Sequence, residues 1–162
     1  MKALLVAFFA SAALQAAPVS AAAPESPLFG RWTLDTATLP MPPEMRPKRV
    51  TLSFDPVADG RIATQVLIVD QNDRAMTSES TLSLDGTPGR ASGTYWVDVL
   101  AAKMPAPNVL VMQFVYEGVP RSTRVYSVSA DGKVLTETEA YFKEDATPVM
   151  RTAQFTRVDG RP

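Results

Sequence analysis

The stretch "LFGRWTLD" covers Leu28–Asp35 and comes four residues after an alanine-rich segment. It places Gly30 and Trp32 two residues apart at the start of what we expect to be the first strand of the folded protein. Large aromatic side chains dominate core energetics, so a tryptophan beside a glycine at this position suits a plug that closes one end of a fold. The alternative is that Trp32 contacts a ligand.

The chain beyond this stretch consists of short runs rich in Val, Thr, Tyr and Phe, separated by turn signals. Asp-Gly occurs at Asp59-Gly60, Asp85-Gly86 and Asp131-Gly132, and each pair predicts a hairpin turn. The segments Thr36–Pro47 and Ala101–Pro107 contain prolines that cannot serve a central ladder, so both are expected to be loops. We therefore predict strands at residues 28–35, 48–55, 61–70, 74–84, 93–100, 108–117, 121–129, 133–142 and 148–158.

This succession of strands predicts an all-β fold in which a single antiparallel up-and-down barrel of eight or nine strands closes on itself. Closure removes the edges that an open sheet would leave free to aggregate. A β-sandwich of two sheets is the alternative. The sequence shows no internal repeat and no second domain, so residues 24–162 are expected to form one β-barrel domain.

The first 23 residues have the pattern of a secretory signal peptide. Lys2 supplies the positive charge, Ala3–Ala17 the apolar region, and Val19–Ala23 the small residues near a cleavage site. The alternative is a membrane anchor, but the apolar run is short for a bilayer span, which needs about 20 residues. We expect a secreted or periplasmic bacterial protein that has no membrane span after processing.

The composition excludes several functional classes. The chain has no cysteine and no histidine, which removes disulfides, thiolate nucleophiles, Ser-His-Asp triads and histidine-ligated zinc or haem. We therefore predict no catalytic residues, no cofactor and no metal site. The net charge is −1 and no basic block stands out, so a nucleic-acid partner is not expected.

The segment Val125–Phe142 can be placed in register around Asp131-Gly132 if these residues form a two-residue type I′ turn, with positive φ at both positions. One face of this hairpin then carries Arg124 opposite Glu139, and Tyr126 opposite Glu137. Because charges favour water, this face is expected to lie outside. The small, uncharged face is expected to line the interior as a candidate ligand-binding wall, made of Thr123, Val125, Ser127, Thr136, Thr138 and Ala140.

Two arginines are candidate anion ligands. Arg124-x-Tyr126 is similar to the Arg-x-Tyr pair that holds a carboxylate in fatty-acid-binding barrels, although the predicted register gives Arg124 an ordinary cross-strand role outside. If Phe142 lies opposite Val149, Arg151 faces Ala140 on the inner side. A buried arginine needs an anion, either from a ligand or from a neighbouring Asp or Glu. A slip of one residue in this register would instead send Arg151 outside, into solvent.

The segment "FGRWTLD" (Phe29–Asp35) resembles the Gly-x-Trp motif on the first strand of lipocalins. The order of features after the signal peptide is similar to that of small exported bacterial lipocalin-like proteins. The resemblance implies that Trp32 packs across the closed end of the barrel and that a basic residue of the last strand, Arg157, lies over it. The chain lacks a Thr-Asp-Tyr motif, disulfides and a helix after the last strand, which indicates a minimal or divergent barrel.

Together these features favour a non-catalytic protein that binds a small apolar or amphipathic molecule, with Arg151 suited to an acidic head group. The alternative from another class is a structural or protein-interaction module of the cell envelope with a filled barrel, and an unrecognised enzyme ranks third. A continuous internal cavity of about 300 Å³ or more would favour ligand binding.

Overall fold

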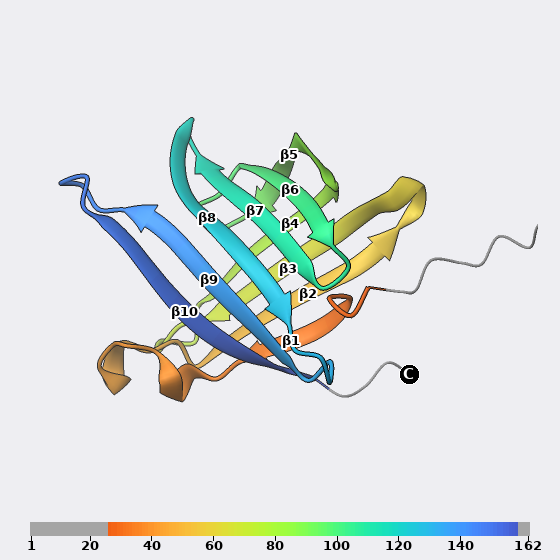
Figure 1. The fold of residues 1–162 in the computed structure, drawn as a ribbon. Coiled ribbons are helices and arrows are strands. Elements are labelled where there is room, and N and C mark those ends of the chain that lie inside the picture. Colours follow the sequence, from red (N-terminus) through yellow and green to blue (C-terminus); the bar gives the residue numbers. More distant parts are fainter. Residues whose placement is uncertain (1–25, 159–162) are drawn as a thin grey trace, which may run out of the picture.

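The computed structural model describes residues 26–158, which form ten antiparallel strands closed into one barrel (Figure 1). Each strand pairs with the next along the chain, and β1 lies between β2 and β10 to close the circle. The predicted all-β closed barrel is confirmed, and the signal peptide predicted for residues 1–23 lies outside the described residues. The strands are β1 (Gly30–Leu34), β2 (Arg49–Val57), β3 (Arg61–Val69), β4 (Ala75–Ser83), β5 (Asp85–Gly93), β6 (Val99–Ala106), β7 (Val109–Tyr116), β8 (Val119–Val128), β9 (Val134–Phe142) and β10 (Pro148–Arg157).

Three single 3₁₀ turns complete the secondary structure of the described residues: η1 (Thr36–Thr38), η2 (Pro43–Met45) and η3 (Ala58–Gly60). The first two lie in the proline-rich segment between β1 and β2, which we call the crossing (residues 35–48). Across residues 26–158, no helix has the length and apolar character needed to pass through a bilayer.

The predicted number of strands was too low, because β5 and β6 contain glycines and prolines that indicate loops. The predicted strand 93–100 was also wrong, since residues 94–98 form the β5–β6 loop. Pro88 in β5 and Pro105 in β6 lie where the pairing of the strands is irregular. The register shifts between Asp85 and Pro88, and it shifts again between Lys103 and Ala106, the segment that contains Pro105. A bulge tolerates a residue without an N–H, so the strands continue through these prolines.

The register of the β8–β9 hairpin is confirmed, since Thr123 pairs with Ala140 and Arg124 pairs with Glu139. The predicted turn type was wrong. Of Asp131 and Gly132, only Gly132 has a positive φ, at 72°, and its N–H donates to the carbonyl of Ser129. The loop therefore spans four residues, 130–133, but remains centred on Asp131-Gly132, and this symmetry preserves the pairing.

The two faces of this hairpin are the reverse of the prediction. Tyr126, Glu137 and Glu139 are buried inside the barrel, together with Val128 and Leu135 on the same face. The charged residues lie in the interior because they form ion pairs with one another across the strands. The hydroxyl groups on the other face lie outside, where they can hydrogen-bond to water. The predicted ligand-binding wall is thus a half-buried part of the outer surface, comprising Thr123, Val125, Ser127, Thr136, Thr138 and Ala140.

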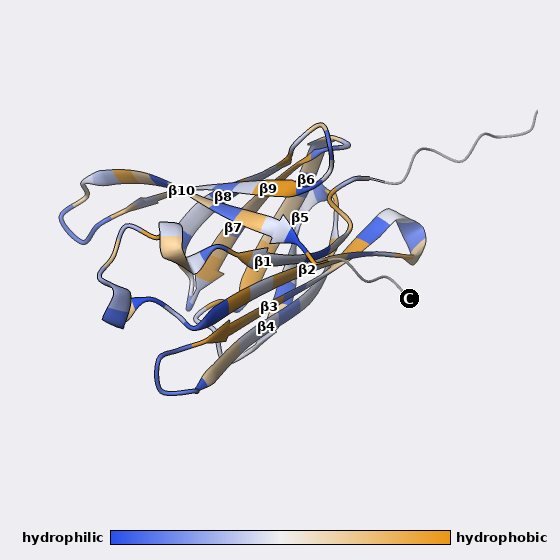
Figure 2. Cartoon of the chain, turned by 90° about the horizontal axis from the view of Figure 1, so that it is seen from below, coloured by the Kyte–Doolittle hydropathy of each residue, from blue (hydrophilic) through white to orange (hydrophobic). Residues whose placement is uncertain are grey.

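Large apolar side chains fill the end of the barrel where β1 begins and β10 ends, which we call the closed end. Figure 2 shows hydrophobic and hydrophilic residues alternating along the strands, so that one face of each can turn to this core. The most completely buried side chains are Trp32, Tyr126, Leu28, Ile62, Leu82, Leu110 and Leu135. Trp32 has an exposed fraction of 0%, so its side chain is completely enclosed by this packing.

Trp32 is the plug that its position in the sequence predicts. Its Nε1 donates to the carbonyl of Leu28 at 3.0 Å, and the guanidinium of Arg157 lies 4.1 Å from the centre of its ring. Arg157 also donates to the carbonyls of Gly132 (2.7 Å), Phe29 (2.8 Å) and Pro27. This arginine therefore ties the last strand, the β8–β9 turn and the N-terminal segment together over the tryptophan.

Gly30 makes this arrangement possible. Its φ is +128°, a conformation that favours glycine, and a Cβ atom at this position would lie 2.7 Å from Nη1 of Arg157. The two residues of the Gly-x-Trp motif thus have complementary roles. Trp32 fills the closed end, and Gly30 leaves room for the cation that covers it.

Candidate functional site

At the opposite, open end, the barrel interior contains a cluster of charged side chains that we call the ion cluster: Arg124, Glu137, Glu139 and Arg151. Nη2 of Arg124 lies 3.0 Å from Oε1 of Glu139, and its Nη1 lies 3.6 Å from Oε1 of Glu137. On the other side of Glu139, Oε2 lies 2.5 Å from Nε of Arg151. The cluster runs across three neighbouring strands, because β8, β9 and β10 place these residues on one face.

Arg124 lies deep in the cluster, with 12% of its side chain exposed. Besides its two carboxylates, it donates to the hydroxyl of Tyr95 at 3.0 Å and to that of Ser122 at 3.3 Å, and it lies 4.4 Å from the centre of the Phe114 ring. Because these neighbours occupy its donors and one face, the charge of Arg124 is balanced by the protein itself. This differs from an arginine held free for the carboxylate of a ligand.

The protonation of the cluster follows from its burial. Burial raises the pKa of Glu137, and the nearby Arg124 offsets only part of that shift. Burial and the charge of Glu137 raise the pKa of the Tyr126 phenol well above its usual value. Burial alone would lower the pKa of Arg124, but the facing tyrosines and carboxylates outweigh burial and raise it, so Arg124 stays charged.

Arg151 occupies the outer edge of the cluster, where 49% of its side chain is exposed. Its Cζ lies 5.4 Å from the centre of the Tyr141 ring. Within residues 26–158, the guanidinium of Arg151 makes one hydrogen bond to protein, from its Nε to Glu139. The four N–H groups on its two Nη atoms therefore remain for water or an anionic ligand.

Tyr95 reaches the cluster because the chain leaves β5 abruptly at Gly93. This glycine has a φ of +129°, and a Cβ atom there would lie 2.1 Å from the carbonyl oxygen of Thr77. The same oxygen accepts hydrogen bonds from the N–H groups of Thr94 (2.8 Å) and Tyr95 (2.9 Å). The β5–β6 loop is thereby held across the open end, with Tyr95 directed to Arg124 and Trp96 beside it.

Two cavities lie on either side of these residues. The first, of about 250 Å³, is lined by four aromatic side chains and by Arg121, Ser122, Arg124, Glu139 and Arg151. The second, of about 180 Å³, lies under the crossing and is largely apolar, with Leu39, Met41, Leu52, Ile68 and Phe155 in its wall. Tyr95, Arg124 and Arg151 line both cavities, so the Tyr95–Arg124 hydrogen bond lies between them. Neither cavity alone reaches about 300 Å³, the lower range for ligand pockets.

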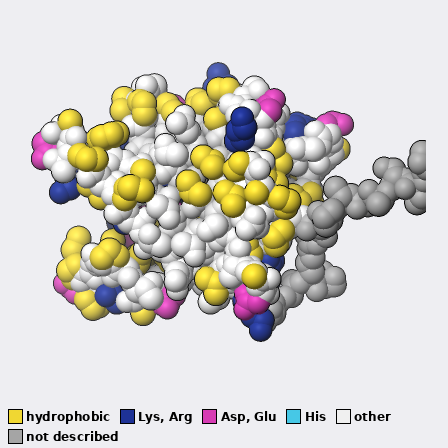
Figure 3. Space-filling model, viewed as in Figure 1, with side chains coloured by type: hydrophobic (Ala, Val, Ile, Leu, Met, Phe, Trp, Pro, Cys, Tyr) yellow, Lys and Arg dark blue, Asp and Glu magenta, His cyan; other side chains and the backbone are white. Residues whose placement is uncertain are grey.

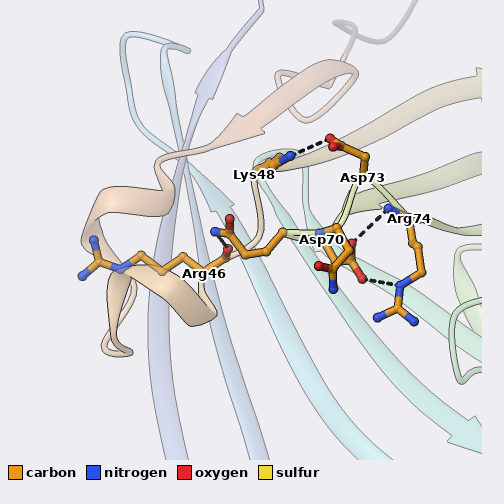
Figure 4. Close-up of polar contacts among 7 residues, drawn as sticks. Arg46, Lys48, Asp70, Asp73 and Arg74 are labelled. Atoms are coloured by element: carbon orange, nitrogen blue, oxygen red, sulfur yellow. Dashed lines mark hydrogen bonds and ion pairs between the residues drawn. The ribbon is translucent and has the colours of Figure 1, made fainter.

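The roof of the apolar cavity is fastened to the β3–β4 turn (Figure 4). Lys48 Nζ lies 2.7 Å from Oδ1 of Asp73, and the amide of Gln71 donates to the carbonyl of Arg46. Asp70 in turn accepts hydrogen bonds from the backbone and the side chain of Arg74, which shape the turn. These contacts are exposed, so they restrain the crossing without making it part of the core.

A third depression, of about 660 Å³, lies on the polar outer face of β1 to β5. It contains no aromatic residue, and its largest apolar side chain is an alanine. Such a surface does not suit an apolar or amphipathic ligand. Its lining residues are Arg31, Ser53, Asp55, Ala63, Thr64, Gln65, Glu79, Ser80, Thr81, Arg90, Ala91 and Ser92.

Of the predicted ligand-binding residues, the structure places only Arg151 at the internal cavities. Two errors in the prediction for Arg151 cancel one another. The observed pairing sets Arg151 opposite Glu139 instead of Ala140, a slip of one residue, but the inner face of β9 was also misassigned. The second cavity and the contributions of Tyr95, Glu137 and the crossing were missed. The large apolar residues Val128 and Leu135, which share a face with Arg124 and Glu139, are the sequence signal that could have shown the correct face.

Among residues 26–158, no group of three or more Asp or Glu residues is arranged to hold a metal ion. Comparison with known proteins found neither a family model nor a curated protein that matches this chain.

Proposed function

We propose that this chain is an exported, non-catalytic β-barrel that binds a small amphipathic molecule with an acidic group at its open end. The kinship to lipocalins implied by the Gly-x-Trp motif is part of this proposal. The packing of Arg157 over Trp32 supports it, and the ten strands make it a divergent member.

The observation that carries the proposal is the position of Arg151. This half-exposed cation lines both cavities, and its Nη groups are available to an anion. A carboxylate bound there would accept hydrogen bonds from these Nη groups, and Arg121 places a second cation in the lining of the first cavity. The neighbouring apolar cavity under the crossing would take the hydrocarbon part of the same molecule.

A direct test is a titration with a fluorescent fatty-acid analogue. Binding by the unaltered protein is expected, and Arg151→Leu should weaken it by about 1.5–3 kcal/mol, the usual range for hydrogen bonds to a charged group. Glu139 keeps Arg124 as a partner in this variant, so the fold should persist. Arg90→Leu is the matched control, since Arg90 lies on the outer face of β5 and away from both internal cavities.

Equal affinity of the unaltered protein and Arg151→Leu would rule out this anchor. No binding by either protein would favour the second candidate, a filled-barrel interaction module. The packed closed end and the separation of the two small cavities support that candidate.

A further inference from the structure

Exposed apolar side chains are concentrated around the open end of the barrel. Six large hydrophobic residues are strongly exposed in residues 26–158, and five of them lie at this end, in or near four different connections. Their exposed fractions lie between 55% and 72%, whereas Val158, at the closed end, is 42% exposed. We call these five residues the apolar rim: Met45 on the crossing, Trp96 on the β5–β6 loop, Val119 after the β7–β8 turn, and Phe142 and Met150 on the β9–β10 hairpin.

Basic residues accompany the apolar rim. Arg46, Lys143 and Arg151 directly follow Met45, Phe142 and Met150, and Arg121 lies two residues after Val119. An apolar tip beside a cation has the layered chemistry of a bilayer surface, where phosphate groups lie just outside the hydrocarbon. Tryptophan is enriched at that boundary, because its ring is apolar and its N–H is polar.

The arrangement of the rim suits a lipid surface better than a protein partner. A protein-binding site usually has a contiguous apolar centre with a polar border. Here the apolar side chains are divided among four connections and the strand ends beside them. Figure 3 shows hydrophobic groups on the projecting β9–β10 tip and on the crossing, with a recess between them. Separate tips can enter a fluid bilayer independently, but they would leave gaps against a rigid partner.

From this combination we infer that the apolar rim docks the open end of the barrel onto a phospholipid bilayer. Glu44, Glu117, Glu144 and Asp145 occupy the same connections and balance the rim cations, so attachment should depend on apolar insertion and phosphate contacts more than on anionic lipid. Docking would place the mouth beside Arg151 against the membrane. It is a property of the surface and does not require the proposed ligand.

The two tryptophans make this inference testable in the unaltered full-length chain. The protein would be mixed with phosphatidylcholine vesicles, with and without bromine on the acyl chains. Trp96 is expected to shift its emission to the blue and to be quenched by the brominated lipid, while Trp32, fully buried at the closed end, is not. Trp96→Phe should abolish the response.

Vesicle sedimentation of variants provides the second measurement. Phe142→Ser with Met150→Ser should weaken the partitioning into vesicles by about tenfold or more, because two large apolar groups no longer leave water. Val158→Ser, at the opposite end, is the matched control and should bind as the unaltered chain does.

Several results would overturn the inference. Vesicle binding without quenching of Trp96 would show attachment by another segment, such as the apolar run Ala3–Ala17. Absence of vesicle binding would leave a protein partner as the occupant of the rim. The quenching experiment needs no variant, so it decides the question even if the serine substitutions prevent folding. The fatty-acid titration is done without vesicles, so either proposal can fail alone.

Discussion

Replacing Arg124, the cation at the centre of the ion cluster, is the sharpest test of which side chains face the interior of this barrel. Arg124→Leu would leave Glu137 without its nearest cation, while Glu139 would keep Arg151. The side chains of Arg124 and Glu137 are 12% and 10% exposed, so water can screen the remaining charge only slightly. Breaking a buried ion pair on one side costs about 3–5 kcal/mol, and we expect the free energy of unfolding to fall by that amount at pH 7.

The pH dependence of this loss has a definite sign. Without Arg124, the pKa of Glu137 should rise further above its ordinary value, because burial would no longer be offset by that cation. A carboxyl whose pKa is raised by folding destabilises the protein above that pKa and not below the unfolded value. The penalty should therefore shrink as the pH falls from 7 towards 5, by up to about 1.4 kcal/mol per pH unit.

Urea denaturation followed by circular dichroism at pH 7 and pH 5 would measure both effects. The double variant Arg124→Leu with Glu137→Leu is the control for packing. Because it removes both charges, it should recover most of the stability at pH 7 and lose the added pH dependence. A loss of less than about 1 kcal/mol in Arg124→Leu, as expected of an exposed pair, would refute the buried cluster.

Two further predictions concern single positions. Gly30→Ala should destabilise the barrel by about 1–3 kcal/mol through its backbone conformation alone, and by more once Arg157 is displaced from its ring contact. Gly118→Ala, with positive φ but no atom within 4 Å of the added Cβ, should lose less, and equal losses in urea denaturation would contradict the role of Gly30. Glu137→Gln should gain stability relative to the unaltered protein as the pH rises from 4.5, because the raised pKa of Glu137 makes its ionisation costly in the folded state. Parallel stability–pH curves for the two proteins would argue against that assignment.

Local sequence patterns determined much of this architecture. Alternating strands and the turns at Asp59-Gly60 and Asp131-Gly132 indicated an up-and-down barrel, because a hairpin connection constrains only residues close to it. The third predicted turn, Asp85-Gly86, lies instead at the start of β5. The β8–β9 register was predictable from Asp131-Gly132 for the same reason, even though the turn differs in type. Gly30, Trp32 and the resemblance they carry also located the closed end and its partner Arg157.

Tertiary structure decided which face of each strand turns inward. In β8 and β9, the local pattern gives one charged face and one face of small residues. The preference of charges for water led to the wrong prediction that the small-residue face lies inside. The charged face lies inside because Arg124, Glu137 and Glu139 neutralise one another there, while Tyr126 and Leu135 add buried apolar surface. Tertiary structure also decided that β5 and β6 are strands. Their glycines and prolines indicate loops, but these segments pair with neighbouring strands of the barrel. Such compensation depends on residues brought together by closure of the barrel, and no single segment of the sequence contains it.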